Sequence, residues 1–303
     1  MLRAALLGAA GSRTLQRFAH RHGMNLGARR FVAGETLDDF SAVARGLNER
    51  GLRVAAGLLG EDVRDARDAR AAAQLFEGIL ERIAAERLQA TVALKLTHLG
   101  LEADPQAAYE NVRGVVERAR ELGNFVRLDM ESSRYVDPTL HVYRRLRAAG
   151  YANVGAVLQS YLYRSQADLR GMLAFAPNLR LVKGAYLEPP AVAYRKKSDV
   201  DENFARLVEL CLREGGFTAV ATHDERLIER AIDFIRANRI SADRYEFQML
   251  YGVRPALQAD LVRRGFPVRV AVPFGTQWYP YLMRRLAERP ANVLFFASNM
   301  WRA

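Results

Sequence analysis

The chain has 303 residues, half of them hydrophobic, and a formal charge of +11 at pH 7. This length suits one α/β barrel, and no linker rich in Ser, Gly or Pro divides it. The single cysteine, Cys211, excludes a disulfide framework and a cysteine-based metal site. The five histidines form no His-x-x-x-His pair, so we expect no bound metal.

The positive charge raises the alternative of a nucleic-acid-binding module. Such a module needs basic residues gathered on one face, whereas here arginines are scattered along amphipathic segments, often beside Glu or Asp. A solvated exterior explains this pattern better, and we expect no nucleic-acid partner.

The first residues only superficially resemble a secretion signal. Their apolar stretch is short and continues into a basic amphipathic segment, so we expect a cytoplasmic protein with an N-terminal helical extension over 1–50. No run of about 18 apolar residues is present, which predicts that no helix spans a membrane. Peripheral contact with the inner face of the cell membrane remains open.

Eight apolar runs alternate with amphipathic helices along the rest of the chain. The predicted strands are 53–59, 90–97, 125–130, 154–160, 179–184, 217–222, 245–250 and 268–273. The predicted helices are 67–87, 105–122, 139–148, 165–175, 200–214, 225–238, 255–264 and 279–288. This alternation predicts a parallel (β/α)8 TIM barrel as one catalytic domain over 51–303.

Polar side chains follow almost every predicted strand. In a barrel of this kind the active site lies at the carboxyl ends of the strands, so these residues should line one mouth. They include Glu61, Lys95, Asp129, Gln159, Lys183, Thr222, His223 and Gln248.

The last predicted helix carries a stripe of functional residues. Tyr281, Arg284, Arg285 and Glu288 stand at i, i+3, i+4 and i+7, so they share one face. Two adjacent guanidinium groups favour an anion, and arginine matches a carboxylate bidentately. The alternative is a solvated helix face, since the pair at 144–145 occurs without any other signal.

Two groups of residues at the mouth suggest different ligands. The first, a mixed-charge pocket, suits a small carboxylic acid, unless it is a closed ion-pair network that needs no ligand. It comprises Lys95, Arg284, Arg285, Glu61, Asp129 and Glu288. The second suits an extended cofactor with phosphates, although no Gly-x-Gly-x-x-Gly or Walker sequence is present. It comprises Gln159, Arg180, Lys183, Gly184, Ala185, Thr222 and His223.

Taken in order, the motifs resemble those of the proline dehydrogenases. They are Leu58-Leu-Gly-Glu61, Leu94-Lys-Leu-Thr97, Arg127-Leu-Asp-Met-Glu131, Leu158-Gln-Ser-Tyr161, Arg180-Leu-Val-Lys-Gly-Ala-Tyr186, Ala221-Thr-His-Asp224, Glu246-Phe-Gln248 and Tyr281-x-x-Arg-Arg-x-x-Glu288. The resemblance implies a distorted barrel with the last helix over its mouth. It also implies FAD-dependent oxidation of L-proline to Δ1-pyrroline-5-carboxylate, with a membrane quinone as the electron acceptor.

The resemblance also implies roles for individual residues. Lys95, Arg284 and Arg285 would bind the substrate carboxylate beside Tyr281 and Glu288, and Glu61 would pair with Arg284 as a gate. Asp129 would hold the cationic side chains, and Arg180 would lie near flavin N5. The FAD would be lined by Met130, Gln159, Lys183, Gly184, Ala185, Thr222 and His223.

One position departs from the family pattern. A tyrosine that packs over the substrate ring usually precedes the Val-Pro of the last strand, and this chain has Ala271 there. The smaller side chain is expected to weaken proline binding and to make room for hydroxyproline.

A second barrel enzyme is kept as an alternative. Lys95 or Lys183, each at a strand end, could form a Schiff base in an aldolase. That enzyme would need no flavin and would be trapped by borohydride together with a carbonyl substrate.

Overall fold

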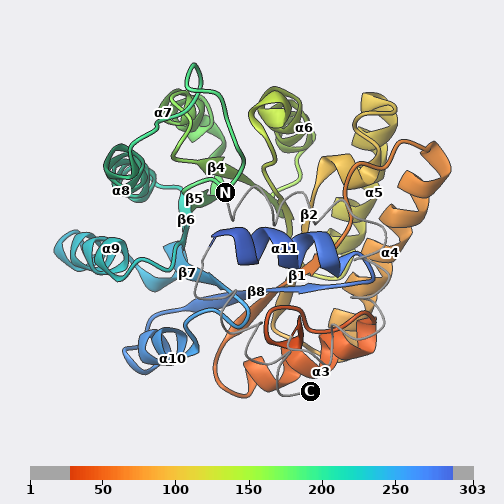
Figure 1. The fold of residues 1–303 in the computed structure, drawn as a ribbon, viewed down its shortest axis with the longest axis horizontal. Coiled ribbons are helices and arrows are strands. Elements are labelled where there is room, and N and C mark those ends of the chain that lie inside the picture. The colour runs from red at the N-terminus through yellow and green to blue at the C-terminus, as the bar shows by residue number, and fades with distance from the viewer. Residues whose placement is uncertain (1–27, 289–303) are drawn as a thin grey trace.

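The computed structural model describes the backbone of residues 28–288 and the side chains as far as Met283. Eight parallel strands close into a barrel in the order of the sequence (Figure 1). Their bounds are β1 Arg53–Leu58, β2 Ala90–Leu94, β3 Val126–Leu128, β4 Val154–Gln159, β5 Asn178–Val182, β6 Phe217–Ala221, β7 Tyr245–Leu250 and β8 Val268–Phe274. The predicted TIM barrel is therefore confirmed.

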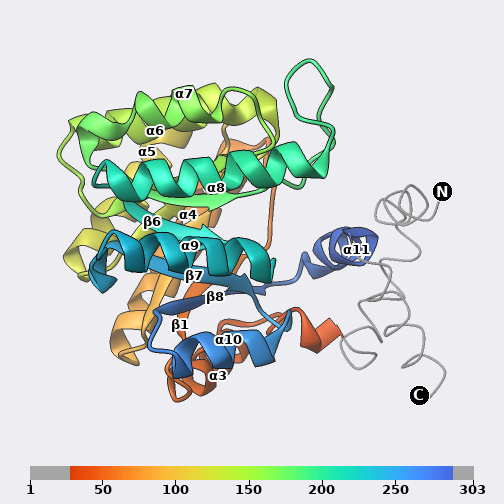
Figure 2. The ribbon, with the colours of Figure 1, turned by 90° about the vertical axis from the view of Figure 1, so that its left-hand side faces the viewer.

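Helices surround the barrel, except for the last one, α11, which lies at one end of it. Figure 1 shows α11 across the front of the barrel, and Figure 2 shows it beyond the carboxyl end of β8, so it covers the mouth as expected. The α-helices are α3 Leu37–Asn48, α4 Ala66–Ala85, α5 Pro105–Glu121, α6 Val136–Ala148, α7 Ser165–Arg170, α8 Lys197–Arg213, α9 Glu225–Ala237, α10 Pro255–Arg263 and α11 Trp278–Glu288. Among these helices, none combines the length and the apolar character that a membrane crossing requires.

Side-chain caps begin several of these helices. Thr36 caps α3 in a reciprocal capping box with Asp39, and Asp65, Asp104 and Asp224 cap α4, α5 and α9 by accepting bonds from first-turn amides. Each cap therefore fixes the residue at which its helix begins.

Two predicted elements end at least three residues earlier than expected. The helix predicted over 165–175 stops at Arg170, and a short 3₁₀ turn, Leu173–Phe175, follows. Ala176 then takes a left-handed conformation (φ 44°) before Pro177, which ends helical structure. The strand predicted over 90–97 ends at Leu94, because Leu96–Leu99 form another 3₁₀ turn.

Polar side chains occupy part of the barrel interior. Arg180 on β5 reaches Gln248 on β7, and Arg127 on β3 reaches Asn178 on β5. These strands are not neighbours, so both contacts cross the interior. The apolar pattern predicted strands that are hydrophobic on both sides, and this holds only for the side that faces the helices.

Candidate active site

The charged pocket at the mouth begins with an ion pair between Lys95 and Glu61. Lys95 follows β2 and Glu61 follows β1, and the parallel pairing of these strands brings both strand ends to the same edge. Both side chains are about three-quarters buried. The structure thus brings together two of the six predicted pocket residues.

A second ion pair joins Arg180 and Asp129. Arg180 rises from the middle of β5, and Asp129 directly follows β3, where its amide donates to the Leu94 carbonyl (2.8 Å). Arg180 Nε also donates to Gln248 Oε1 (2.6 Å). The guanidinium group is therefore held from two sides.

A buried hydrogen-bonded group surrounds Gln159 at the end of β4. Its amide donates to the Glu131 carbonyl (3.2 Å), and the Glu131 carboxyl accepts from Thr97 Oγ1 (2.7 Å). Burial raises the pKa of Glu131. Within the described residues, Gln159 Oε1 is buried without a hydrogen-bond partner, which is costly unless a ligand supplies a donor. Met130 is buried beside this group.

Lys183 lies in a cluster of carboxylates after β5. Its ammonium group contacts Asp201 at 2.6 Å and Asp224 at 3.1 Å. Burial alone would raise the pKa of Asp224, but Lys183 and Lys197 outweigh it and hold this pKa at about 2. Lys183 is thus a cation held by two carboxylates within the group of residues predicted to bind the cofactor.

Gly184 and Ala185 follow Lys183. A Cβ atom on Gly184 would lie 2.3 Å from the ring of Tyr161, and the backbone is left-handed there (φ 106°), so no other residue fits without rearrangement. Ala185 is exposed. The missing side chain of Gly184 thus makes room for the ring of Tyr161.

The residues after β6 are tied to neighbouring strand ends. Thr222 Oγ1 accepts from the Asp224 amide (3.2 Å), and His223 Nε2 accepts from the Leu250 amide (2.9 Å). An accepting Nε2 requires a neutral ring with its proton on Nδ1. His223 therefore helps to anchor the end of β7. Its predicted contact with the cofactor would be a second role.

The remaining predicted residues lie on β8 and α11. Ala271 is two residues from Arg269, so both face the barrel interior. Tyr281 is half-buried and packs against the apolar cluster that holds Trp278. Arg284, Arg285 and Glu288, also predicted for the site, belong to α11 by their backbone, and the structure does not describe their side chains.

A buried histidine that the motif analysis did not use lies beside this pocket. His98 packs edge-on against Phe76, and its Nδ1 has no hydrogen-bond partner among the described residues. Burial, reinforced by Lys95, lowers the pKa of His98 to about 4.

The depressed pKa predicts a loss of stability in acid. The unfolded chain takes up this proton near pH 6.5 and the folded protein only near pH 4, so stability is complete above pH 6.5 and falls below it. We expect a loss of about 3 kcal/mol between pH 7 and pH 4 from this group. Urea unfolding at several pH values should show a shallower acid loss in His98→Leu, whereas exposed His141→Leu should keep the parental slope. Equal slopes in all three proteins would contradict the assignment.

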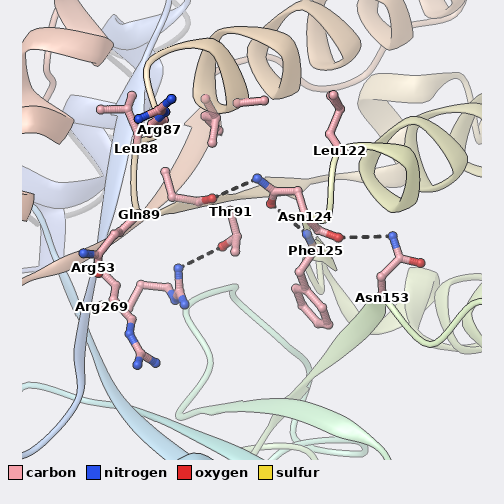
Figure 3. Close-up of a pocket in the computed structure, with 14 residues that line it drawn as sticks. Arg53, Arg87, Leu88, Gln89, Thr91, Leu122, Asn124, Phe125, Asn153 and Arg269 are labelled. Carbon is pink, nitrogen blue, oxygen red and sulfur yellow. Dashed lines mark hydrogen bonds between the residues drawn. The ribbon is translucent and has the colours of Figure 1, made fainter.

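A cavity of about 560 Å³ lies at the opposite, amino-terminal end of the barrel. Figure 3 shows Arg53 and Arg269 close together at one side of it, with Arg269 donating to Thr91. None of the predicted site residues lines this cavity. It therefore does not belong to the candidate active site.

The fold and the mouth define a class of protein, namely a (β/α)8-barrel enzyme with a mixed-charge site at the carboxyl ends of its strands. A family model described as "Proline dehydrogenase" matches residues 40–298. The chain belongs to the proline dehydrogenase family.

Individual relatives and solved structures agree with this assignment. The chain is 40% identical over 300 residues to Proline dehydrogenase 1 of Bacillus subtilis (strain 168), covering 99% of both proteins. It is 40% identical over 304 residues to Proline dehydrogenase of Deinococcus radiodurans, covering 99% of this chain and 98% of that protein. The proline utilization A structure from Bdellovibrio bacteriovorus, inactivated by N-propargylglycine, has a similar fold (TM-score 0.80, 24% identity, 87% of this chain and 32% of that one).

Proposed function

We propose that this protein oxidises L-proline to Δ1-pyrroline-5-carboxylate, the first step of proline catabolism, with FAD as its cofactor. The observation that carries the proposal is family membership over nearly the whole chain. The charged mouth agrees with it, because a small zwitterionic acid needs cations for its carboxylate and an exit for the proton of its amine.

The proposed substrate site uses the ion pairs around Lys95. Lys95, Arg284 and Arg285 bind the carboxylate, Glu61 balances Lys95 and closes over the pocket with Arg284, and Tyr281 and Glu288 line it. Asp129 holds Arg180 beside the reacting ring. Anchoring the carboxylate orients the proline ring, and the neutral amine then loses its proton as C5 becomes the imine carbon.

The cofactor site fits FAD on one observation. The buried, unpartnered Gln159 Oε1 can accept the ring N–H of a flavin, and Gly184 would line the site beside it. Met130, Arg180, Lys183, Ala185, Thr222 and His223 would complete the lining. When bound, FAD would supply the two-electron acceptor, whose N5 would take the hydride from C5 of proline.

We propose a membrane quinone as the final electron acceptor, reached by peripheral contact with the lipid surface. The formal charge of +11 supports attraction to anionic headgroups. We also propose that residues 1–50 form an extension to one catalytic domain over 51–303.

Anaerobic titration with proline tests the function. Purified protein should be yellow, and L-proline should bleach its flavin absorbance, whereas D-proline should not. A colourless protein that does not take up FAD would overturn the proposal. The Schiff-base alternative predicts borohydride trapping at Lys95 or Lys183, yet both ammonium groups are held in ion pairs, which makes them poor nucleophiles.

Ala271 should set the choice between proline and hydroxyproline. In Ala271→Tyr we expect kcat/KM for L-proline to rise about tenfold or more, because an aromatic ring would cover the substrate. The ratio of activities on trans-4-hydroxyproline and proline should fall. Ala271→Leu serves as the control that adds volume without an aromatic face. Unchanged selectivity in Ala271→Tyr would refute this role.

A further inference from the structure

A chain of buried polar side chains runs through the barrel interior up to the candidate active site. We call it the interior network: Arg269, Glu246, Gln248, Arg180 and Asp129. Arg269 Nε donates to Glu246 Oε1 (2.7 Å), Gln248 Nε2 donates to the same oxygen (2.6 Å), and Arg180 Nε donates to Gln248 Oε1 (2.6 Å). The ion pair of Arg180 with Asp129 completes it at the mouth.

The chemistry of its members fixes the direction of every hydrogen bond. A carboxylate only accepts, so the amide nitrogen of Gln248 must face Glu246. The amide oxygen then faces Arg180, whose guanidinium only donates. If the amide were turned over, both of its contacts would fail. Glu246 therefore determines the orientation of Gln248, and Gln248 presents an acceptor to Arg180.

Burial makes this arrangement rigid. Glu246 is 2% exposed, Gln248 5% and Arg180 9%, so water cannot easily replace a lost partner. Burial opposes the charge of Glu246, but Arg269 and Gln248 outweigh it and hold the pKa of its carboxyl below the ordinary value. Glu246 thus stays an acceptor at neutral pH.

Two arginines at the amino-terminal end of the network explain why a carboxylate is needed at position 246. Arg53 and Arg269 are direct register partners on β1 and β8, and like charges in that position repel. Glu246 lies between them, 2.7 Å from Arg269 and 3.6 Å from Arg53. Figure 3 shows these two arginines beside the amino-terminal cavity. They lie at the start of β1 and β8, whereas Asp129 follows the end of β3.

We propose that Gln248, oriented by Glu246, is a positioning residue for Arg180. Gln248 accepts a hydrogen bond from Arg180 Nε and so holds the guanidinium group where it pairs with Asp129 and faces the reacting atoms. The proposal rests on the proposed function, in which Arg180 lies beside flavin N5. In this proposal Gln248 and Glu246 act through Arg180.

Gln248→Met in the FAD-loaded protein tests this role. Met has a similar shape but no acceptor for Arg180, so kcat for proline should fall roughly 10- to 100-fold, the usual effect of a misplaced active-site group. KM should change less than twofold, as should the Kd of a proline analogue with oxygen in place of the ring nitrogen. The flavin midpoint potential, measured without substrate, should become more negative as the guanidinium charge moves away.

Gln258→Met is the matched control. Gln258 is equally buried (3% exposed) and donates to the carbonyls of Leu250 and Val253 beside the barrel wall. Its loss should lower thermal stability but leave kcat and the midpoint potential at parental values. A merely structural role for Gln248 would make the two variants behave alike, and that result would overturn the proposal.

A double-mutant cycle separates the positioning role from a general loss of stability, because a general loss would lower kcat in every background. Lysine has a methylene group where arginine has its Nε–H, so it cannot make the hydrogen bond that Arg180 Nε donates to Gln248. In an Arg180→Lys background, Gln248→Met should therefore lower kcat no further. Additive losses would refute the positioning role. Failure of the proposed function looks different, since the unmodified protein would then not be bleached by proline.

Discussion

Replacing Lys95 with Met is expected to lower kcat/KM for L-proline by roughly 30- to 1,000-fold. The reason is the position of its ammonium group, which is three-quarters buried against Glu61 at the edge where β1 and β2 end. In Lys95→Met, Glu61 keeps its negative charge without this partner and repels the carboxylate of the incoming substrate. Most of the loss should appear in KM, because the cation binds the substrate before and during the reaction.

Steady-state kinetics with a matched charge control check this expectation. Arg87→Met removes one positive charge from an exposed residue at the amino-terminal end of the barrel, beside the cavity there. It should leave kcat/KM within twofold of the parental value. Equal losses in both variants would mean that overall charge, and not the site at Lys95, governs proline binding.

Replacing Glu246 with Leu is expected to lower the free energy of unfolding by about 3–5 kcal/mol. Glu246 is 2% exposed and is the carboxylate that contacts both Arg269 and Arg53. Without it, Arg269 remains buried beside another cation. Urea unfolding followed by circular dichroism measures the loss.

A second substitution shows whether the buried charge is the cause. Arg269→Met in the Glu246→Leu background removes the stranded cation and should recover part of the stability. Arg53→Met alone should cost less than about 1 kcal/mol, since Arg53 is nearly half-exposed and 3.6 Å from the carboxylate. If the double variant were less stable than Glu246→Leu, the cost would have to come from packing.

The Glu246 and Gln248 variants separate two contributions of one interior network. Glu246 supplies charge to a barrel that buries several arginines and also orients Gln248, so its loss should appear in stability and in turnover. Gln248 supplies a directed hydrogen bond, and its loss should appear mainly in turnover. Stability and activity would thus depend on neighbouring residues of the same strand.

The order of elements in the chain determined the architecture. Strands 245–250 and 217–222 were predicted to within one residue, because apolar runs bounded by polar turn residues and amphipathic helices carry local information. Lys95, Asp129 and Arg180 were predicted at one mouth because they belong to motifs on or after predicted strands, and the carboxyl ends of barrel strands meet at one mouth. Local breaks were missed, for example where α7 ends at Arg170 and a short 3₁₀ turn takes the place of its predicted last residues.

Tertiary structure alone decided which polar residues meet. A strand pattern shows that Glu246 and Gln248 face the same side, but only closure of the barrel brings Gln248 to Arg180, 68 residues away, and Arg269 to the carbonyl of Val54, 215 residues away. The pairing of Lys95 with Glu61 depends in the same way on neighbouring strands. Side-chain periodicity is local, whereas hydrogen-bond partners are set by the register and closure of the sheet, so the charged interior of this barrel emerged only in three dimensions.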